Sequence, residues 1–259
     1  MENALLVGLS RQMALTHDID IVANNIANID TTGYKADNAL FSEYLMPGAR
    51  DGQFTGSDRR ISFVRDTGSW IDFSAGPIQH TGNPLDVAID GNAYLAVQTP
   101  QGVRYTRNGA LQTNATGQLV TDEGYPVLGD NGPITFQPGD HSVNITPSGI
   151  ITVRNGSDPS DAPRGRLQLA AFAQQNLLQK EGGSMFSAPP GVAPIAPSLG
   201  TRLVQGAIEK SNVNAVAEIS RMIQITQSYT DIANVLQQQG DQRTSALTQL
   251  SQVPASGSA

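Results

Sequence analysis

Four charged residues in the middle of the chain are the types that general acid and base catalysis uses. They are Asp86, Asp90, Arg107 and Asp122. Each lies beside a turn in a segment with strand-like patterning. Asp and Asn favour such places because their side chains hydrogen-bond the backbone of the turn. We therefore interpret these residues as local turn contacts and expect no catalytic residues.

The residue types that bind metals and cofactors do not form a site in this sequence. His17, His80 and His141 are scattered along the chain without the spacing of metal ligands, and there is no Cys. The sequence also lacks a Ser/His/Asp arrangement, a phosphate-binding loop and a dinucleotide fingerprint. We expect no metal, no cofactor and no enzymatic activity.

The composition limits the possible partners and the possible locations of the protein. The chain has 259 residues and a formal net charge of -7, which argues against a nucleic-acid partner held by a basic surface. No stretch approaches the roughly 18 apolar residues of a membrane span, so we expect no membrane insertion. Residues 1–8 lack the basic start of a signal peptide. Both a cytoplasmic protein and one exported without a cleaved signal fit.

The N-terminal region has the apolar period of a helix. From residue 3 to residue 29, apolar side chains repeat at alternating steps of three and four, with Gly8 and Gln12 interrupting the first turns. Gly33 is suited to follow the end of this helix. The apolar positions of this N-terminal seam are Leu5, Leu15, Ile19, Val22, Ile26 and Ile29.

The middle of the chain is patterned for short strands. Runs such as 85–89, 103–106 and 119–121 are each followed by Asp-Gly, Asn-Gly or Glu-Gly, and further runs lie at 134–136, 143–145, 150–153 and 167–172. Regularly spaced short strands with such turns are typical of an antiparallel barrel or sandwich. We predict a β-rich domain over residues 69–180.

A second helical region follows a connector that is rich in Pro and Gly. Residues 181–205 contain four prolines and are expected to be extended. Helical spacing then returns over 206–250. Its C-terminal seam has the period of a coiled coil and is interrupted by Thr226, Gly240 and Arg243; the apolar positions are Ile219, Met222, Tyr229, Ala233, Leu236, Leu247 and Leu250.

The two helical regions differ in length, and this difference suggests assembly. At about 1.5 Å per residue, the C-terminal helix would be roughly 65 Å long and the N-terminal helix roughly 40 Å. Pairing them within one chain would leave part of the longer seam uncovered, and another chain usually covers such a surface. An ordinary intramolecular helical hairpin is the alternative.

Four motifs resemble those of flagellar rod, hook and hook–filament junction proteins. Residues 21–35 (IVANNIANIDTTGYK) resemble the N-terminal signature, and 206–214 (GAIEKSNVN) resemble the start of the C-terminal helix in that family. Residues 81–91 (TGNPLDVAIDG) and 105–109 (YTRNG) with 117–121 (GQLVT) are similar to middle-domain motifs of the rod and hook subgroup. Gly91 is not followed by a second Gly and paired aromatics, which favours a proximal-rod over a distal-rod member.

The resemblance implies that the protein is a structural subunit of the periplasmic proximal rod. It implies export by the flagellar type III apparatus, assembly with copies of itself and with other rod and hook proteins, and torque transmission. The helical termini would form an inner tube. Its expected subunit contacts are Leu15, Ile19, Val22, Asn24, Asn25, Ile26 and Asn28 in the N-terminal part, and Asn212, Val213, Ile219, Met222, Tyr229, Ala233, Leu236 and Leu247 in the C-terminal part.

The asparagines have a second interpretation. Asn24, Asn25 and Asn28 either fix the register between subunits, as a buried polar residue can in a coiled coil, or cap the end of the helix. For Asn28, the capping interpretation is favoured.

The expected fold is α+β, with two long coiled-coil-like helices flanking an antiparallel β barrel or sandwich. The division is 1–35 for the N-terminal helix, 36–68 for a connector, 69–180 for the β domain, 181–205 for the second connector, 206–250 for the C-terminal helix and 251–259 for a tail. Two other functions remain open, a secreted β-domain adhesin and a β-rich hydrolase. A distal-rod subunit is the nearest alternative.

Overall fold

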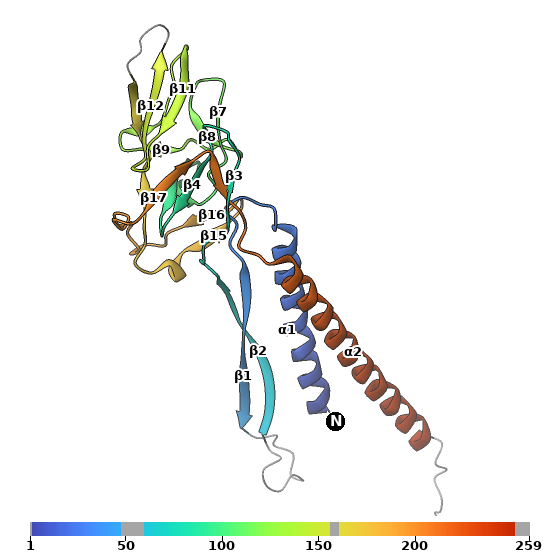
Figure 1. Cartoon of the computed structure of the whole chain (residues 1–259). Helices are drawn as coiled ribbons and strands as arrows, with labels where there is room; N and C mark the ends of the chain where they lie inside the picture. Colours follow the sequence, from blue (N-terminus) through green and yellow to red (C-terminus); the bar gives the residue numbers. More distant parts are fainter. Residues whose placement is uncertain (1, 48–59, 156–160, 252–259) are drawn as a thin grey trace, which may run out of the picture. The chain divides into compact units, whose positions relative to one another are not determined.

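A computed structural model of the chain describes residues 2–47, 60–155 and 161–251 (Figure 1). The fold consists of an N-terminal helix, a β-rich central region and a C-terminal helix, as the sequence predicts. The chain divides into two compact units. Unit 1 comprises residues 1–26, 37–70 and 215–259, and unit 2 comprises residues 27–36 and 71–214.

Unit 1 is built from both helices and a two-stranded sheet. Helix α1 spans Glu2–Ala27, close to the predicted 3–29. Helix α2 spans Ala215–Ser251, and strands β1 (Asp37–Pro47) and β2 (Arg60–Ile71) form the sheet. The sequence pattern of residues 36–68 indicated a connector and did not predict this sheet. Alternation of apolar and polar residues is the usual signal for a strand, and the residues within β1 and β2 do not simply alternate.

The expected start of the C-terminal helix is wrong by nine residues. The helix begins at Ala215, and the residues just after Gly206 form strand β18 (Ala207–Glu209), which pairs with β3. Gly206 has a positive φ of 73°, which starts a turn rather than a helix. Asn214 precedes the first helical residue, where Asn is a preferred cap. Residues 206–214 therefore belong to the β-rich unit.

Unit 2 is a set of small sheets. Its largest sheet has the strand order β14-β5-β6-β16-β15, and a second has the order β11-β12-β13. The two-stranded sheets are β9–β10, β17–β4, β18–β3 and β7–β8, and the pairings within unit 2 are antiparallel. Among the described residues these sheets do not close into a barrel.

The strands of unit 2 begin with β3 (Ile78–His80), β4 (Val87–Asp90), β5 (Tyr94–Thr99), β6 (Gly102–Thr106), β7 (Leu111–Thr113), β8 (Leu119–Thr121), β9 (Leu128–Gly129) and β10 (Gly132–Pro133). They continue with β11 (Asp140–Ile145), β12 (Ile150–Asn155), β13 (Ala162–Arg166), β14 (Leu169–Ala170), β15 (Gln179–Glu181), β16 (Met185–Ser187) and β17 (Arg202–Gln205). A short 3-10 helix spans Gln175–Leu177. Within the predicted second connector, β16 pairs with β6 and β17 with β4.

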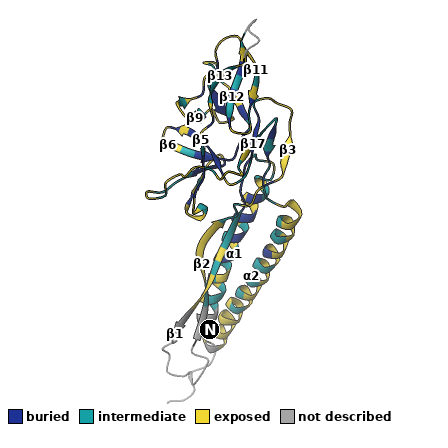
Figure 2. Ribbon diagram, turned by 60° about the vertical axis from the view of Figure 1, so that its left-hand side comes forward, coloured by how far each residue is buried: buried dark blue, intermediate teal, exposed yellow. Residues whose placement is uncertain are grey.

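Strand β5 separates two hydrophobic cores in unit 2. Buried residues are dark blue in Figure 2. Alternate side chains of a strand point to opposite faces. Leu95 and Val97 therefore enter the larger, mainly aliphatic core, whereas Tyr94 and Ala96 enter a smaller aromatic core. In the aromatic core, Tyr94 packs edge-on against Phe172 and Phe186, with ring centroids 5.9 and 5.7 Å apart. These cores belong to unit 2 alone.

Candidate assembly interface

Helices α1 and α2 pack against each other in opposite directions within unit 1. Near the start of α1, Gly8 lies against Leu236, and further along Asp18 accepts a hydrogen bond from Arg221, with a distance of 2.9 Å between Oδ1 and Nη2. As the residue number rises in one helix, it falls in the other. The helical hairpin within one chain, which was the alternative interpretation of the two seams, is therefore present, and it covers only part of each helix.

The covered face of α2 is shifted from the predicted C-terminal seam. Met222, Tyr229 and Leu236 belong both to the predicted seam and to the covered face, and they are half-buried. Between them the buried position is Ile225, which was not predicted, while Thr226, the polar residue at the neighbouring seam position, is exposed. The covered face contains Glu218, Met222, Ile225, Tyr229, Ile232, Leu236 and Gln239.

The other residues predicted for the C-terminal seam differ in exposure. Ala233 is half-buried, whereas Ile219 is half-exposed and Leu247 is 67% exposed. Beyond Gln239, residues 240–249 of α2 are all exposed.

The predicted residues of α1 are mostly covered within the chain. Val22 is completely buried, and Leu15, Ile19 and Ile26 are half-buried. The buried stripe also contains Ala14, Asp18 and Ile21. Contacts of these residues with other subunits remain a prediction.

The three asparagines of the N-terminal motif have different environments. Asn25 is completely buried and bonds the backbone of Asp37 twice, donating from Nδ2 to the carbonyl at 2.8 Å and accepting from the amide at 2.9 Å. It thus replaces a strand partner at the start of β1. Asn24 is exposed. Asn28 follows the last residue of α1 and accepts a hydrogen bond from the Thr31 hydroxyl, which fits a role at the helix end.

Both helices expose large apolar side chains. On α1, Leu6, Leu9 and Met13 follow one another at helical spacing, and Met13 is 67% exposed. On α2, Val216, Ile219 and Ile223 do the same. Val235 and Leu247 add two more exposed residues further along α2. An apolar surface of this kind usually marks a site of association.

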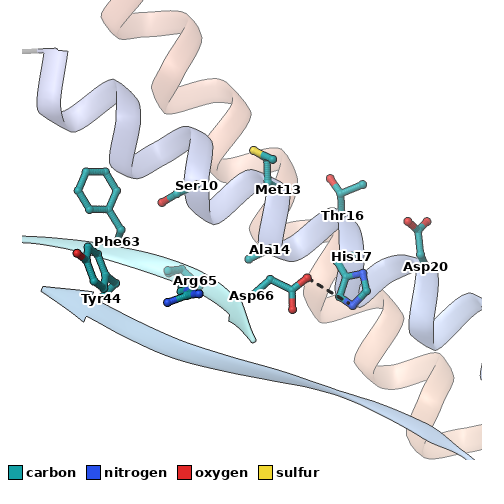
Figure 3. A pocket seen from close by; sticks show the side chains of 11 residues that line it. Ser10, Met13, Ala14, Thr16, His17, Asp20, Tyr44, Phe63, Arg65 and Asp66 are labelled. Atoms are coloured by element: carbon teal, nitrogen blue, oxygen red, sulfur yellow. Dashed lines mark ion pairs between the residues drawn. The ribbon is translucent and has the colours of Figure 1, made fainter. Parts of the chain in front are cut away.

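A groove of about 680 Å³ lies between α1 and the β1–β2 sheet of unit 1 (Figure 3). Met13 and Ala14 line it from the helix, and Tyr44 and Phe63 line it from the strands. At one end, the imidazole of His17 lies 3.6 Å from the Asp66 carboxylate. The groove extends the exposed apolar surface of α1.

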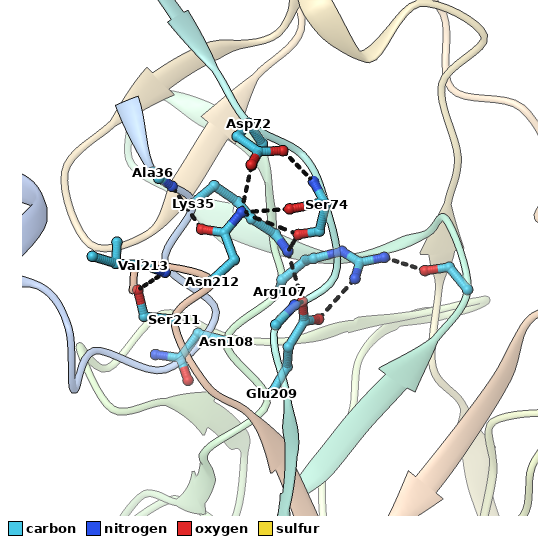
Figure 4. Close-up of polar contacts among 12 residues, drawn as sticks. Lys35, Ala36, Asp72, Ser74, Arg107, Asn108, Glu209, Ser211, Asn212 and Val213 are labelled. Carbon is cyan, nitrogen blue, oxygen red and sulfur yellow. Dashed lines mark hydrogen bonds and ion pairs between the residues drawn. The ribbon is translucent and has the colours of Figure 1, made fainter. Parts of the chain in front are cut away.

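Unit 2 contains a buried ion cluster where the two terminal motifs of the sequence meet (Figure 4). The carboxylate of Glu209 pairs with Lys35 through Oε1 at 2.6 Å and with Arg107 through Oε2 at 2.7 Å. All three residues are at most 2% exposed. Burial lowers the pKa of Lys35 below its usual value, and the Glu209 charge opposes that shift. The pairing keeps three charges inside the unit.

Asn212 fastens the same region with its side-chain amide. Its Oδ1 accepts the Ala36 amide at 2.8 Å, and its Nδ2 donates to the Asp72 carbonyl at 2.8 Å. The neighbouring Val213 is half-buried, and its amide donates to the Ser211 hydroxyl at 3.3 Å. Asn212 was predicted as a subunit contact, and the structure gives it a role within the chain.

The charged residues first considered for catalysis have separate local partners. The Asp86 carboxylate accepts bonds from Thr81 and Asn83 at 2.6 and 2.8 Å. Asp122 accepts a bond from Asn108, and Asp90 pairs with Arg202 at the surface. Arg107 belongs to the ion cluster.

Sequence reasoning missed Lys35 and Glu209, which both lie inside the terminal motifs. A signal was available, because each is one of only two charged residues in its motif, beside Asp30 and Lys210 respectively. Their partnership was not visible because 174 residues separate them.

Neither helix of the described residues contains an apolar stretch long enough to cross a bilayer. Three family models match the chain in order. They are described as flagella basal body rod protein over residues 5–35, flagellar hook protein FlgE/F/G D1 domain over 88–153, and flagellar basal body rod FlgEFG protein C-terminal over 204–250. None of these families is enzymatic.

Relatives match over almost the whole length. The flagellar basal-body rod protein FlgF of Caulobacter vibrioides is 36% identical, covering 98% of this chain and 100% of the relative. FlgF of Mesorhizobium japonicum is 30% identical, covering 96% and 98%. FlgG of Caulobacter vibrioides is 32% identical, covering 95% and 98%. The chain therefore belongs to the flagellar basal-body rod protein family.

Proposed function

We propose that this chain is a structural subunit of the proximal part of the flagellar rod. It polymerises with copies of itself and with related rod proteins, and the polymer transmits motor torque. The observation that carries this proposal is the set of exposed apolar side chains on α1 and α2: Leu6, Leu9, Met13, Val216, Ile219, Ile223, Val235 and Leu247. The relatives are named as flagellar basal-body rod proteins, and these names point to the rod as the assembly.

Repetition of the same contacts in every subunit would stabilise the polymer. Fully burying one such side chain is worth about 1.5–3 kcal/mol. In a polymer, every subunit makes the same contacts, so a modest gain per side chain accumulates along the rod. The contacts expected for the α2 seam, including a coiled-coil arrangement with neighbouring chains, belong to this proposal.

The proposed location is the periplasmic rod of the basal body. The family resemblance supports export by the flagellar type III apparatus without cleavage of a signal peptide, with export information in the first 35 residues. The first residues of this chain are then expected to be retained in the protein of the assembled rod. A protein starting 15 to 30 residues later would contradict this route.

A distal-rod subunit is the second candidate, because FlgG relatives match at nearly the same level as FlgF relatives. The two are separable in cells that lack the distal-rod protein and therefore stall after the proximal rod. A proximal subunit is retained in the partial basal bodies of such cells, whereas a distal subunit is absent.

The assembly surface can be tested with two neighbouring substitutions on α2. Ile223→Asp puts a charge on the proposed apolar surface, and Gln224→Asp puts the same charge on the adjacent exposed residue. Both monomers should melt like the wild type because both sites are exposed. We expect only Ile223→Asp to abolish motility in a strain lacking the native gene. Full motility with Ile223→Asp would contradict the proposed surface.

A further inference from the structure

Glu209 joins several separate parts of unit 2. Its backbone carbonyl accepts the Gly33 amide at 2.8 Å. Its side chain accepts Lys35 Nζ at 2.6 Å, the Gly76 amide at 2.9 Å and Arg107 Nη1 at 2.7 Å. Residues 30–36 and 72–76 therefore meet at one carboxylate.

Further contacts fasten the same two segments to each other. Lys35 Nζ donates to the Ser74 carbonyl at 2.6 Å, and the Asp72 amide donates to the Ala36 carbonyl at 2.8 Å. Asn212 bonds both segments, through the Ala36 amide and the Asp72 carbonyl. All of these contacts are hydrogen bonds.

Residues 30–36 also fit the rest of unit 2 closely. Gly33 has a φ of 68°, and a Cβ there would lie 2.5 Å from the backbone of Arg107 and Asn108. Lys180 donates to the Lys35 carbonyl at 2.7 Å and lies 3.7 Å above the Tyr34 ring. The segment thus occupies a defined place when it is docked.

We infer that residues 30–36 and 72–76 form a clasp that closes on Glu209 and opens as one element, without unfolding the two hydrophobic cores. Neither core contains a residue of these two segments except Phe73, which packs at the edge of the aromatic core. Without the Glu209 charge, Lys35 and Arg107 are buried cations with no carboxylate between them. Such cations are costly to keep inside a protein. Both segments lose the carboxylate charge that they share.

The long separation of the partners sets when the clasp can close. Lys35 precedes Glu209 by 174 residues, so an incomplete chain has no carboxylate to receive it. Residues 30–36 therefore stay undocked until nearly the whole chain has been made. If the proposed function is right, this delay keeps the N-terminal 35 residues available to the export apparatus. The clasp itself does not depend on that function.

Hydrogen exchange of the full-length protein tests the clasp. In the wild type under native conditions, amides of 30–36 and 72–76 should exchange with a common opening step that is faster than the exchange of β5. Glu209→Gln should speed exchange of both segments at least tenfold and leave β5 unchanged. The matched control is Glu181→Gln, which removes the half-exposed partner of Arg104 in the same unit and should change neither segment.

Two results would overturn the inference. The segments do not form one clasp if Glu209→Gln accelerates only one of them. The cluster belongs to the core if β5 accelerates with them. Should Glu209→Gln fail to fold, the wild-type measurement decides: segments that exchange only together with β5 contradict the clasp. Because the isolated protein is measured, neither result depends on motility or on rod assembly.

Discussion

Gly8 of α1 lies directly against Leu236 of α2, so closely that a Cβ on Gly8 would come within 2.6 Å of Leu236 Cδ2. The sequence presents Gly8 as a weak position in an apolar seam. In the structure, the missing side chain instead provides the space that the leucine fills. Helix α1 can approach α2 at this point because residue 8 has no side chain.

Gly8→Leu should destabilise unit 1 although leucine favours helices more than glycine does. Two leucines then compete for one space, and overpacking of this kind costs about 1–3 kcal/mol. Chemical denaturation followed by circular dichroism measures the loss. Combining Gly8→Leu with Leu236→Ala should restore part of it, and a double variant that is no more stable than Gly8→Leu alone would show that the two residues do not share this space.

Asn25→Ala should destabilise unit 1 by about 1–3 kcal/mol, because the amide and carbonyl of Asp37 lose their buried partner. Asp20→Ala is the control five residues earlier on the same helix, where the side chain is exposed. Its effect should stay within about 0.5 kcal/mol. Equal losses for the two variants, measured by urea denaturation, would contradict the bridging role of Asn25.

The Asp140–Arg164 pair should make the stability of unit 2 depend on pH. Two hydrogen bonds from Arg164, at 2.6 and 2.5 Å, hold the pKa of the Asp140 carboxyl below its usual value of 3.8. Since the folded-state pKa is lowered, the pair stabilises fully above 3.8, and this contribution is lost as the pH falls through the folded pKa.

Asp140→Asn should therefore be less stable than the wild type at neutral pH, and the difference should close in acid. Melting temperatures across the pH range provide the measurement. The control is Asp161→Asn, which removes the partner of Arg154 in an exposed pair and should have little effect at any pH. A difference for Asp140→Asn that persists in strong acid would point to a cause other than its charge.

Ending the chain after Gln239 should separate folding from assembly. Residues 240–249 are exposed in unit 1, so their removal should lower the melting temperature of the monomer only slightly. The same residues, including Leu247, are part of the proposed assembly surface, and cells carrying the truncated protein should be non-motile. A truncated monomer that melts much earlier would place this part of α2 in the fold of the single chain.

Local patterns predicted the helices and most of the central strands. The helical period in residues 5–26 and the Asn-Gly or Asp-Gly turns near β4 and β6 depend only on residues that are close together in sequence. They located α1 to within two residues at its end and identified the β-rich centre. Whether the helices form a coiled coil with other chains stays a prediction.

Contacts between distant residues were beyond local patterns. Ile208 and Glu209 lie within apparently helical spacing, but pairing with β3 places them in a strand. The role of Asn25 depends on Asp37, and that of Lys35 depends on Glu209. In each case the partner lies outside the local sequence, and only folding brings the two residues together.

The composition of purified hook–basal bodies tests the central claim most directly. Mass spectrometry of these particles from cells expressing the full-length chain should find it as a constant component that resists the washing that removes loosely bound proteins. Cells expressing Ile223→Asp should yield no complete particles, whereas those with Gln224→Asp should yield particles that contain the protein. If wild-type particles carry a complete rod and hook but do not contain this protein, it is not a rod subunit.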